Sequence, residues 1–90
     1  MGITSITFKI MPISPQVDMA KLKTLVEKKS TELGGKFKRS TEEPIAFGIK
    51  ALMAVVEWPE EKDPDVIESA LGKIENVKSV QMTDVRKLIF

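Results

Sequence analysis

The chain contains no histidine and no cysteine, and these two absences remove a large part of enzyme and metal chemistry. Without cysteine there is no disulfide scaffold, no thiolate nucleophile and no cysteine-based metal site. Without histidine the commonest metal ligand and the commonest general base are missing as well. We therefore expect a protein that is not an enzyme, holds no metal and carries no cofactor.

A strong charge of one sign is also missing, because 14 basic and 13 acidic residues leave a formal net charge of +1. A charge that small does not draw a protein onto nucleic acid or an anionic membrane. No apolar run approaches the roughly 20 residues of a membrane span, and the first residues lack the basic and apolar regions of a signal peptide. We expect a cytosolic protein with neither a membrane nor a nucleic acid as partner.

The 90 residues are enough for one small domain with a single core. No linker and no low-complexity segment divides the chain. We therefore expect residues 1–90 to form one domain, with too little interior for a deep pocket that excludes water.

The first third of the chain predicts a strand followed by a helix. Polar and apolar residues alternate from residue 4 to residue 10, which is the period of a half-buried strand. Asp18 is expected to cap a helix whose apolar residues recur at helical spacing, and the pair Gly34-Gly35 is expected to end it. The residues expected in the core are Ile6, Phe8, Ile10, Leu22, Leu25, Val26 and Leu33.

Two more strands are expected in the middle of the chain. One covers about residues 36–41, and Pro44 after it marks a sheet edge or a bulge. The next covers about residues 47–58, the longest apolar stretch. Both of its alternating faces are apolar, although only one can lie beneath helices. The other face holds ordinary exposed apolar area or meets a partner, such as a second copy of the chain.

The last third predicts a second helix and a final strand. Asp63 as N-cap with Pro64 at the first helical position is a strong start signal for the helix. A strand over about residues 78–85 is expected to follow. The apolar residues expected to face the core are Val66, Ile67, Ala70, Leu71, Ile74, Val80 and Met82.

The order of these elements is β-α-β-β-α-β, with one helix in each half of the chain. That order is typical of the split βαβ, or ferredoxin-like, arrangement. We therefore predict an α+β fold in which a four-stranded antiparallel sheet carries both helices on one face.

Two acidic clusters could be taken for metal sites, but their positions in the sequence do not favour that interpretation. Glu42-Glu43 lies before a proline, and the run from Glu60 to Asp63 lies before a helix. Carboxylates at a helix start are accounted for by capping and by the helix dipole. A hard cation needs several converging oxygens, so we expect no metal site at either cluster.

The basic residues Lys36, Lys38 and Arg39 suggest an alternative function, because ferredoxin-like sheets also bind RNA. Such binding needs aromatic rings on the exposed face of the central strands. Phe8 falls in the buried alternation, and the chain contains no tyrosine. A solvated strand whose charges protect a sheet edge is the favoured interpretation.

The pair Phe47-Gly48 stands where a strand begins. A glycine there permits an unusual dihedral angle or the close approach of another backbone. Packing of Phe47 on the protein's own core is the simpler interpretation. Contact with a partner is the alternative.

The basic pair Arg86-Lys87 lies near the end of the chain, where lysines are usually frayed and solvated. Three large apolar residues follow it, which a disordered end rarely needs. If Leu88 or Phe90 anchors this tail, the neighbouring cation is presented in a fixed place.

Four stretches of the sequence carry a family resemblance: FKIMP (residues 8–12), VDM (17–19), PIAFGIKAL (44–52) and TDVRKL (83–88). Together they resemble the archaeal-type elongation factor 1-beta family, whose members are guanine nucleotide exchange factors for elongation factor 1-alpha. Eukaryotic members carry the same module at the end of a longer protein, and the lack of extra N-terminal domains favours the archaeal form.

The resemblance implies a ferredoxin-like exchange domain that binds the GTPase and not the nucleotide. In the family, a lysine near the C-terminus reaches the magnesium and phosphate region, and a phenylalanine of the FG segment wedges into an adjoining surface. The matching residues are Lys87 and Phe47, with Gly48 and Leu88 beside them. Because this chain has fewer residues between Asp84 and Lys87 than eukaryotic members have, Arg86 stays a rival for the role of the lysine.

Overall fold

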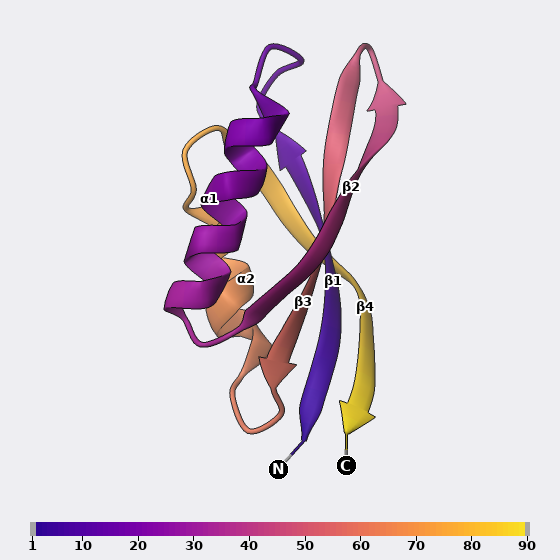
Figure 1. Cartoon of the computed structure of the whole chain (residues 1–90). Helices are drawn as coiled ribbons and strands as arrows, with labels where there is room; N and C mark the ends of the chain where they lie inside the picture. Colours follow the sequence, from indigo (N-terminus) through magenta and orange to yellow (C-terminus); the bar gives the residue numbers. More distant parts are fainter. Residues whose placement is uncertain (1, 90) are drawn as a thin grey trace.

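The computed structural model describes residues 2–89 and contains six elements in the order β-α-β-β-α-β. All strand pairs are antiparallel, and the sheet has the strand order β2-β3-β1-β4. Both helices cover the same face of this sheet (Figure 1). The predicted ferredoxin-like α+β fold is therefore confirmed. The bounds are β1 (Ile3–Pro12), α1 (Met19–Glu32), β2 (Lys36–Ala46), β3 (Ile49–Pro59), α2 (Pro64–Gly72) and β4 (Val77–Ile89).

Both helices begin at the predicted caps. The Asp18 carboxylate accepts hydrogen bonds from the backbone N–H groups of Ala20 and Lys21, at 3.0 and 3.2 Å. The Asp63 carboxylate accepts one from the Asp65 N–H at 2.9 Å, directly before the proline that opens α2. Each cap satisfies backbone donors that the first turn of a helix leaves without a partner.

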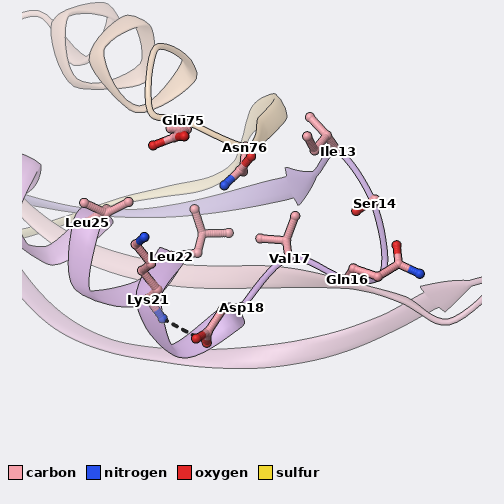
Figure 2. A pocket seen from close by; sticks show the side chains of 10 residues that line it. All are labelled: Ile13, Ser14, Gln16, Val17, Asp18, Lys21, Leu22, Leu25, Glu75 and Asn76. Carbon is pink, nitrogen blue, oxygen red and sulfur yellow. Dashed lines mark hydrogen bonds between the residues drawn. The ribbon is translucent and has the colours of Figure 1, made fainter.

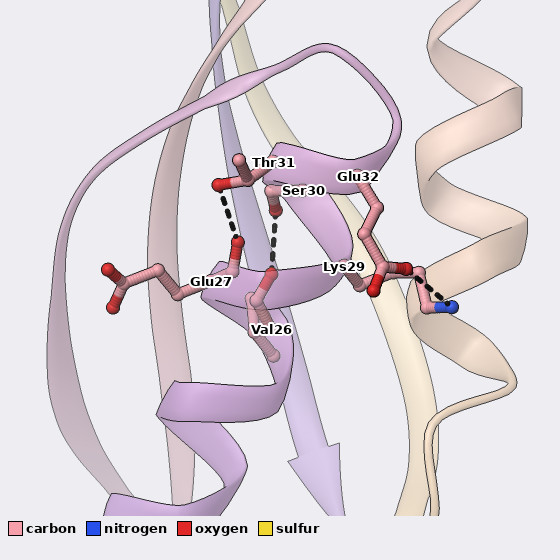
Figure 3. Close-up of polar contacts among 6 residues, drawn as sticks. All are labelled: Val26, Glu27, Lys29, Ser30, Thr31 and Glu32. Carbon is pink, nitrogen blue, oxygen red and sulfur yellow. Dashed lines mark hydrogen bonds and ion pairs between the residues drawn. The ribbon is translucent and has the colours of Figure 1, made fainter.

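The core lies between the helices and the sheet, and most of its predicted members are there. The predicted core residues that are only partly buried are Leu25, Leu33, Ala70, Ile74, Val80 and Met82. Within the described part of the chain, Ser30 is the one polar residue that is fully buried, and its hydroxyl donates to the Val26 carbonyl at 2.8 Å (Figure 3). This bond removes the penalty of burying a hydroxyl. The core residues are Ile6, Phe8, Ile10, Leu22, Val26, Leu52, Ala54, Val56, Trp58, Ile67 and Leu71.

The prediction that Val66 is buried was wrong, since this side chain is 51% exposed. Helix α2 turns only Ile67 and Leu71, four residues apart, fully into the core. Val66 lies on the flank that faces α1, where the two helices leave an open groove of about 560 Å³ between them.

The strands are longer or shorter than their patterns predicted. β2 continues through Pro44 to Ala46, because it is an edge strand and the ladder shifts its register between these two residues. β3 begins at Ile49 and not at residue 47. β4 runs on to Ile89, because it stays paired with β1 as far as Ile3.

The two faces of β3 separate as the alternation predicted. Leu52, Ala54, Val56 and Trp58 lie beneath the helices and are buried. On the open face Met53 and Val55 are only partly exposed, because side chains of the neighbouring strands flank them.

Candidate functional site

The first part of the candidate site is the tip of the β2–β3 hairpin. Ala46 pairs with Ile49, so Phe47 and Gly48 alone make the connection. Their φ angles are 55° and 78°, and positive φ at both central residues is the signature of a type I′ turn. Asparagine followed by glycine is the usual sequence of such a turn, because few other residues accept a positive φ.

Phe47 is 95% exposed, so the interpretation that its ring packs on the protein's own core was wrong. A left-handed backbone costs an ordinary L-residue roughly 1–2 kcal/mol. The turn therefore tolerates a strained backbone and places a large apolar ring in water at the same residue. Local rules are usually broken in this way where function requires it.

A second loop lies beside the hairpin tip. A Cβ atom added to Gly48 would lie 3.8 Å from the Cβ atom of Pro15, in the loop between β1 and α1. Ile13 in that loop and Ile45 before the tip are 56% and 40% exposed. Exposed apolar side chains therefore gather at this end of the molecule.

The β1–α1 loop also borders a pocket of about 290 Å³, with the start of α1 and the turn before β4 as its other walls (Figure 2). The Asp18 carboxylate in this pocket is engaged in capping α1. Ile13 closes the rim, where its N–H donates to the Asn76 carbonyl at 3.0 Å. Among the described residues no group of three or more acidic side chains could hold a metal ion.

The second part of the candidate site is the end of β4. Arg86 pairs with Ser5 and Lys87 with Thr4, so both cations belong to an ordered strand. The interpretation of this segment as a frayed terminus was therefore wrong. Leu88 also lies in β4 and is 47% exposed. Phe90, the other proposed anchor, lies outside the described residues.

A bulge in β4 decides the direction of these two cations. Phe8 pairs with Met82 but Thr7 pairs with Asp84, which leaves Thr83 as an extra residue. The Thr83 hydroxyl donates to the Thr7 carbonyl at 3.3 Å. Simple alternation from Met82 would turn residue 86 toward the helices, whereas the extra residue turns residue 87 that way.

Arg86 and Lys87 consequently point to opposite faces of the sheet, and each has an acidic partner. On the helix side, the Lys87 Nζ atom lies 2.7 Å from a carboxylate oxygen of Glu60, in the loop between β3 and α2. On the open face, the Arg86 Nε atom lies 2.8 Å from a carboxylate oxygen of Asp84. Nothing in the sequence indicated this role for Glu60, because the acidic run from Glu60 to Asp63 was accounted for by the start of α2, where Asp63 is the cap.

The structure does not bring the two parts of the candidate site together. Lys87 pairs with Thr4, and Thr4 pairs with Trp58, which is nine residues from Ile49 along β3. At about 3.3 Å per residue this separates the two parts by about 30 Å. The molecule is 42 Å long, and the hairpin tip and the end of β4 lie at its opposite ends (Figure 1).

The basic residues considered for RNA binding lie on the edge strand β2. The Lys38 Nζ atom lies 3.8 Å from a carboxylate oxygen of Glu57 on the neighbouring strand, and Phe37 packs against the core. Phe8 is fully buried on the helix side. Within residues 2–89 the open face of the central strands therefore offers no aromatic ring on which a base could stack.

Comparisons with known proteins agree on a family. The model of the EF-1 guanine nucleotide exchange domain matches residues 5–88. The chain is 40% identical over 90 residues to elongation factor 1-beta of Methanothermobacter thermautotrophicus, covering 99% of this chain and 100% of that protein. It is 41% identical over 85 residues to elongation factor 1-beta of Methanoculleus marisnigri, covering 93% of this chain and 95% of that one.

Solved structures with little sequence similarity share the fold alone. The C-terminal domain of the MgtC protein from Mycobacterium tuberculosis matches with a TM-score of 0.63 at 9% identity, over 91% of this chain and 85% of that one. The structure titled BlrP1 BLUF matches with a TM-score of 0.60 at 13% identity, over 100% of this chain and 57% of that one. The family model, by contrast, spans nearly the whole sequence, and the chain therefore belongs to the family of EF-1 guanine nucleotide exchange domains.

Proposed function

We propose that this chain speeds GDP release from cytosolic elongation factor 1-alpha through two separate contacts, with Phe47 at one end and Lys87 at the other. The exchange role itself follows from family membership. Such a factor makes and breaks no covalent bond, so the lack of histidine and cysteine is no obstacle. The observation that carries the proposal is the placement of Lys87 in an ordered strand end, directed away from Arg86.

The cation contact acts on the metal of the GTPase. A guanine nucleotide is held largely through its phosphates and the Mg²⁺ ion that bridges them. An ammonium about 4 Å from that ion is repelled by roughly 8 kcal/mol at an effective dielectric constant near 20, which is roughly 4 kcal/mol for each of the two charges of Mg²⁺. Even half of that energy corresponds to a loss of about a thousandfold in affinity, enough to account for a strong effect on GDP release. Lys87, 46% exposed at the end of β4, has the reach for this role.

The aromatic contact supplies affinity for the partner. The Phe47 ring is 95% exposed on a two-residue turn, so it can enter a pocket on another protein without any rearrangement of its own core. Aromatic side chains that fill such pockets commonly carry much of the binding energy of an interface. Gly48 has no side chain that could obstruct the approach of a partner to the ring. At the other end of the molecule, Leu88 follows Lys87 directly.

Thermodynamic linkage completes the exchange cycle. If the factor weakens nucleotide binding, the nucleotide weakens factor binding by the same amount. GTP entering the empty GTPase therefore releases the factor. The factor changes the rate of exchange and leaves the overall nucleotide equilibrium untouched.

The direct test is the release of a fluorescent GDP analogue from purified elongation factor 1-alpha, with and without a catalytic amount of this protein. We expect release to accelerate in proportion to the protein added. An unchanged release rate would contradict the proposal. Tight binding of single-stranded RNA with a steep salt dependence would instead favour the RNA-binding alternative.

A further inference from the structure

We propose that Glu60 is a positioning residue for Lys87, one that holds the ammonium against the β3–α2 loop and must release it before exchange can occur. This inference rests on the proposed role of Lys87. It assigns the glutamate a part in setting the rate of exchange, through the fraction of molecules whose cation is available to the partner.

The geometry holds both members of the pair in place. The Glu60 backbone N–H donates to the Gly2 carbonyl at 3.0 Å, and the turn that contains Glu60 closes with a bond from the Lys62 N–H to the Pro59 carbonyl at 3.1 Å. Lys87 is fixed by its pairing with Thr4 at the end of the sheet. The 2.7 Å contact therefore joins two anchored backbones and not two mobile ends.

Electrostatics gives the sign of the effect. An ammonium that is paired with a carboxylate repels Mg²⁺ less than a free ammonium does, because the carboxylate attracts the ion. The pair must open for Lys87 to act, and its opening competes with docking on the partner. Both side chains are close to half exposed, 46% for Lys87 and 40% for Glu60. Solvent-exposed ion pairs of this kind shift an equilibrium by about two- to fivefold.

A matched pair on the same strand provides the control. Arg86 and Asp84 form an ion pair of similar length, 2.8 Å, on the open face of the sheet. Neutralising Asp84 changes the net charge as much as neutralising Glu60 does. It frees the cation that points away from the helices, so it separates the effect of Lys87 from a general effect of charge.

The experiment compares Glu60→Gln with Asp84→Asn and with Glu61→Gln, the exposed neighbour in the same loop. The measured quantity is the apparent second-order rate constant for GDP release from elongation factor 1-alpha. We expect Glu60→Gln to raise it about two- to fivefold at low salt, and both controls to match the wild type. The gain should disappear near 1 M salt, where the screening length falls to about 3 Å. A purely structural role of Glu60 would not produce this salt dependence.

A Lys87→Ala variant, alone and combined with Glu60→Gln, separates failure of this inference from failure of the proposed function. We expect Lys87→Ala to be slow and the double variant to be equally slow. If Lys87→Ala is slow while Glu60→Gln is unchanged or slower than the wild type, the inference about Glu60 is overturned and the role of Lys87 stands. If Lys87→Ala exchanges normally, the proposed cation mechanism fails. If Asp84→Asn accelerates exchange and Glu60→Gln does not, the role passes to Arg86.

Discussion

At the scale of single residues, the hairpin tip carries a residue type, phenylalanine, that does not favour the stability of the fold. Phe47 has a φ of 55° and is 95% exposed, so neither its backbone nor its ring favours this position. A type I′ turn selects small polar residues for the angle, and water opposes an exposed ring. A residue that is unfavourable on both counts motivates the proposed contact of the ring with a partner.

The substitution Phe47→Asn tests this argument, because asparagine accepts a positive φ and Asn-Gly is the preferred pair of the turn. We expect the free energy of unfolding to rise by about 0.5–1 kcal/mol, which is a few degrees in Tm for a domain of this size. We expect GDP release to slow at the same time. Thermal unfolding and the exchange assay measure the two effects on one sample.

Gly48→Ala is the matched control in the same turn. It adds a Cβ atom at a φ of 78° and should lower the free energy of unfolding by about 1 kcal/mol. If Phe47→Asn lowered the Tm while exchange stayed normal, the ring would be stabilising its own domain and the partner contact would be refuted.

At the scale of single elements, β4 shows what the order of polar and apolar residues predicts and what it leaves undetermined. Alternation correctly placed Val80 and Met82 toward the core. The bulge at Thr83 is marked only by the step of three residues from Met82 to Val85, where alternation has a step of two, and a single such step at the end of the predicted strand was not interpreted as a bulge. The faces of Arg86 and Lys87 depend on that one residue, so alternation alone could not assign them.

Arg86→Ala and Lys87→Ala compare the two faces directly. Each variant removes one positive charge from the same strand, so general electrostatic steering changes equally. Because only Lys87 points to the helix side, we expect Lys87→Ala to slow GDP release at least about tenfold and Arg86→Ala to slow it less than about threefold. Stopped-flow release measured at several salt concentrations distinguishes the two. The reverse order of effects would move the cation contact to the open face.

The connection between α1 and β2 carries a structural requirement that the sequence showed only in part. Gly34-Gly35 was expected to end the helix, and α1 does end at Glu32. Gly34 has the positive φ of a helix stop, 94°. Gly35 serves close packing instead, because a Cβ atom there would lie 2.9 Å from the Trp58 ring and 3.1 Å from a Val56 methyl carbon.

Gly35→Ala should therefore overpack the core and lower the free energy of unfolding by about 1–3 kcal/mol. Gly72→Ala is the control, because Gly72 lies in α2 and has no atom within 4 Å of an added Cβ. It should raise the free energy of unfolding by about 0.5–1 kcal/mol, since alanine is the better helix former. Denaturant titration of both variants measures the difference. Equal stabilities would mean that the Trp58 ring moves aside without loss.

At the scale of the whole molecule, the sequence predicted the fold class because its local signals agreed with one another. Two caps at Asp18 and Asp63, a glycine stop and four predicted strands leave few arrangements other than the ferredoxin-like one. No local signal in the sequence predicted the distance between the two parts of the site. It depends on which end of the sheet each strand reaches, and that follows from β4 continuing to Ile89 beside the first residues of β1.

Two contacts about 30 Å apart should contribute independently to partner binding, because they share no neighbours and lie on different elements. We expect the losses in affinity for the nucleotide-free GTPase caused by Phe47→Ala and Lys87→Ala to add within about 0.5 kcal/mol in the double variant. Titration calorimetry on the four proteins measures this coupling. The pair Glu60→Gln and Lys87→Ala is the positive control, since these side chains are in contact at 2.7 Å and their effects should not add. Strong coupling between Phe47 and Lys87 would mean that both ends contact one continuous surface of the partner and that this surface changes shape on binding. A rigid domain of this length could not by itself carry an energetic coupling from one contact to the other.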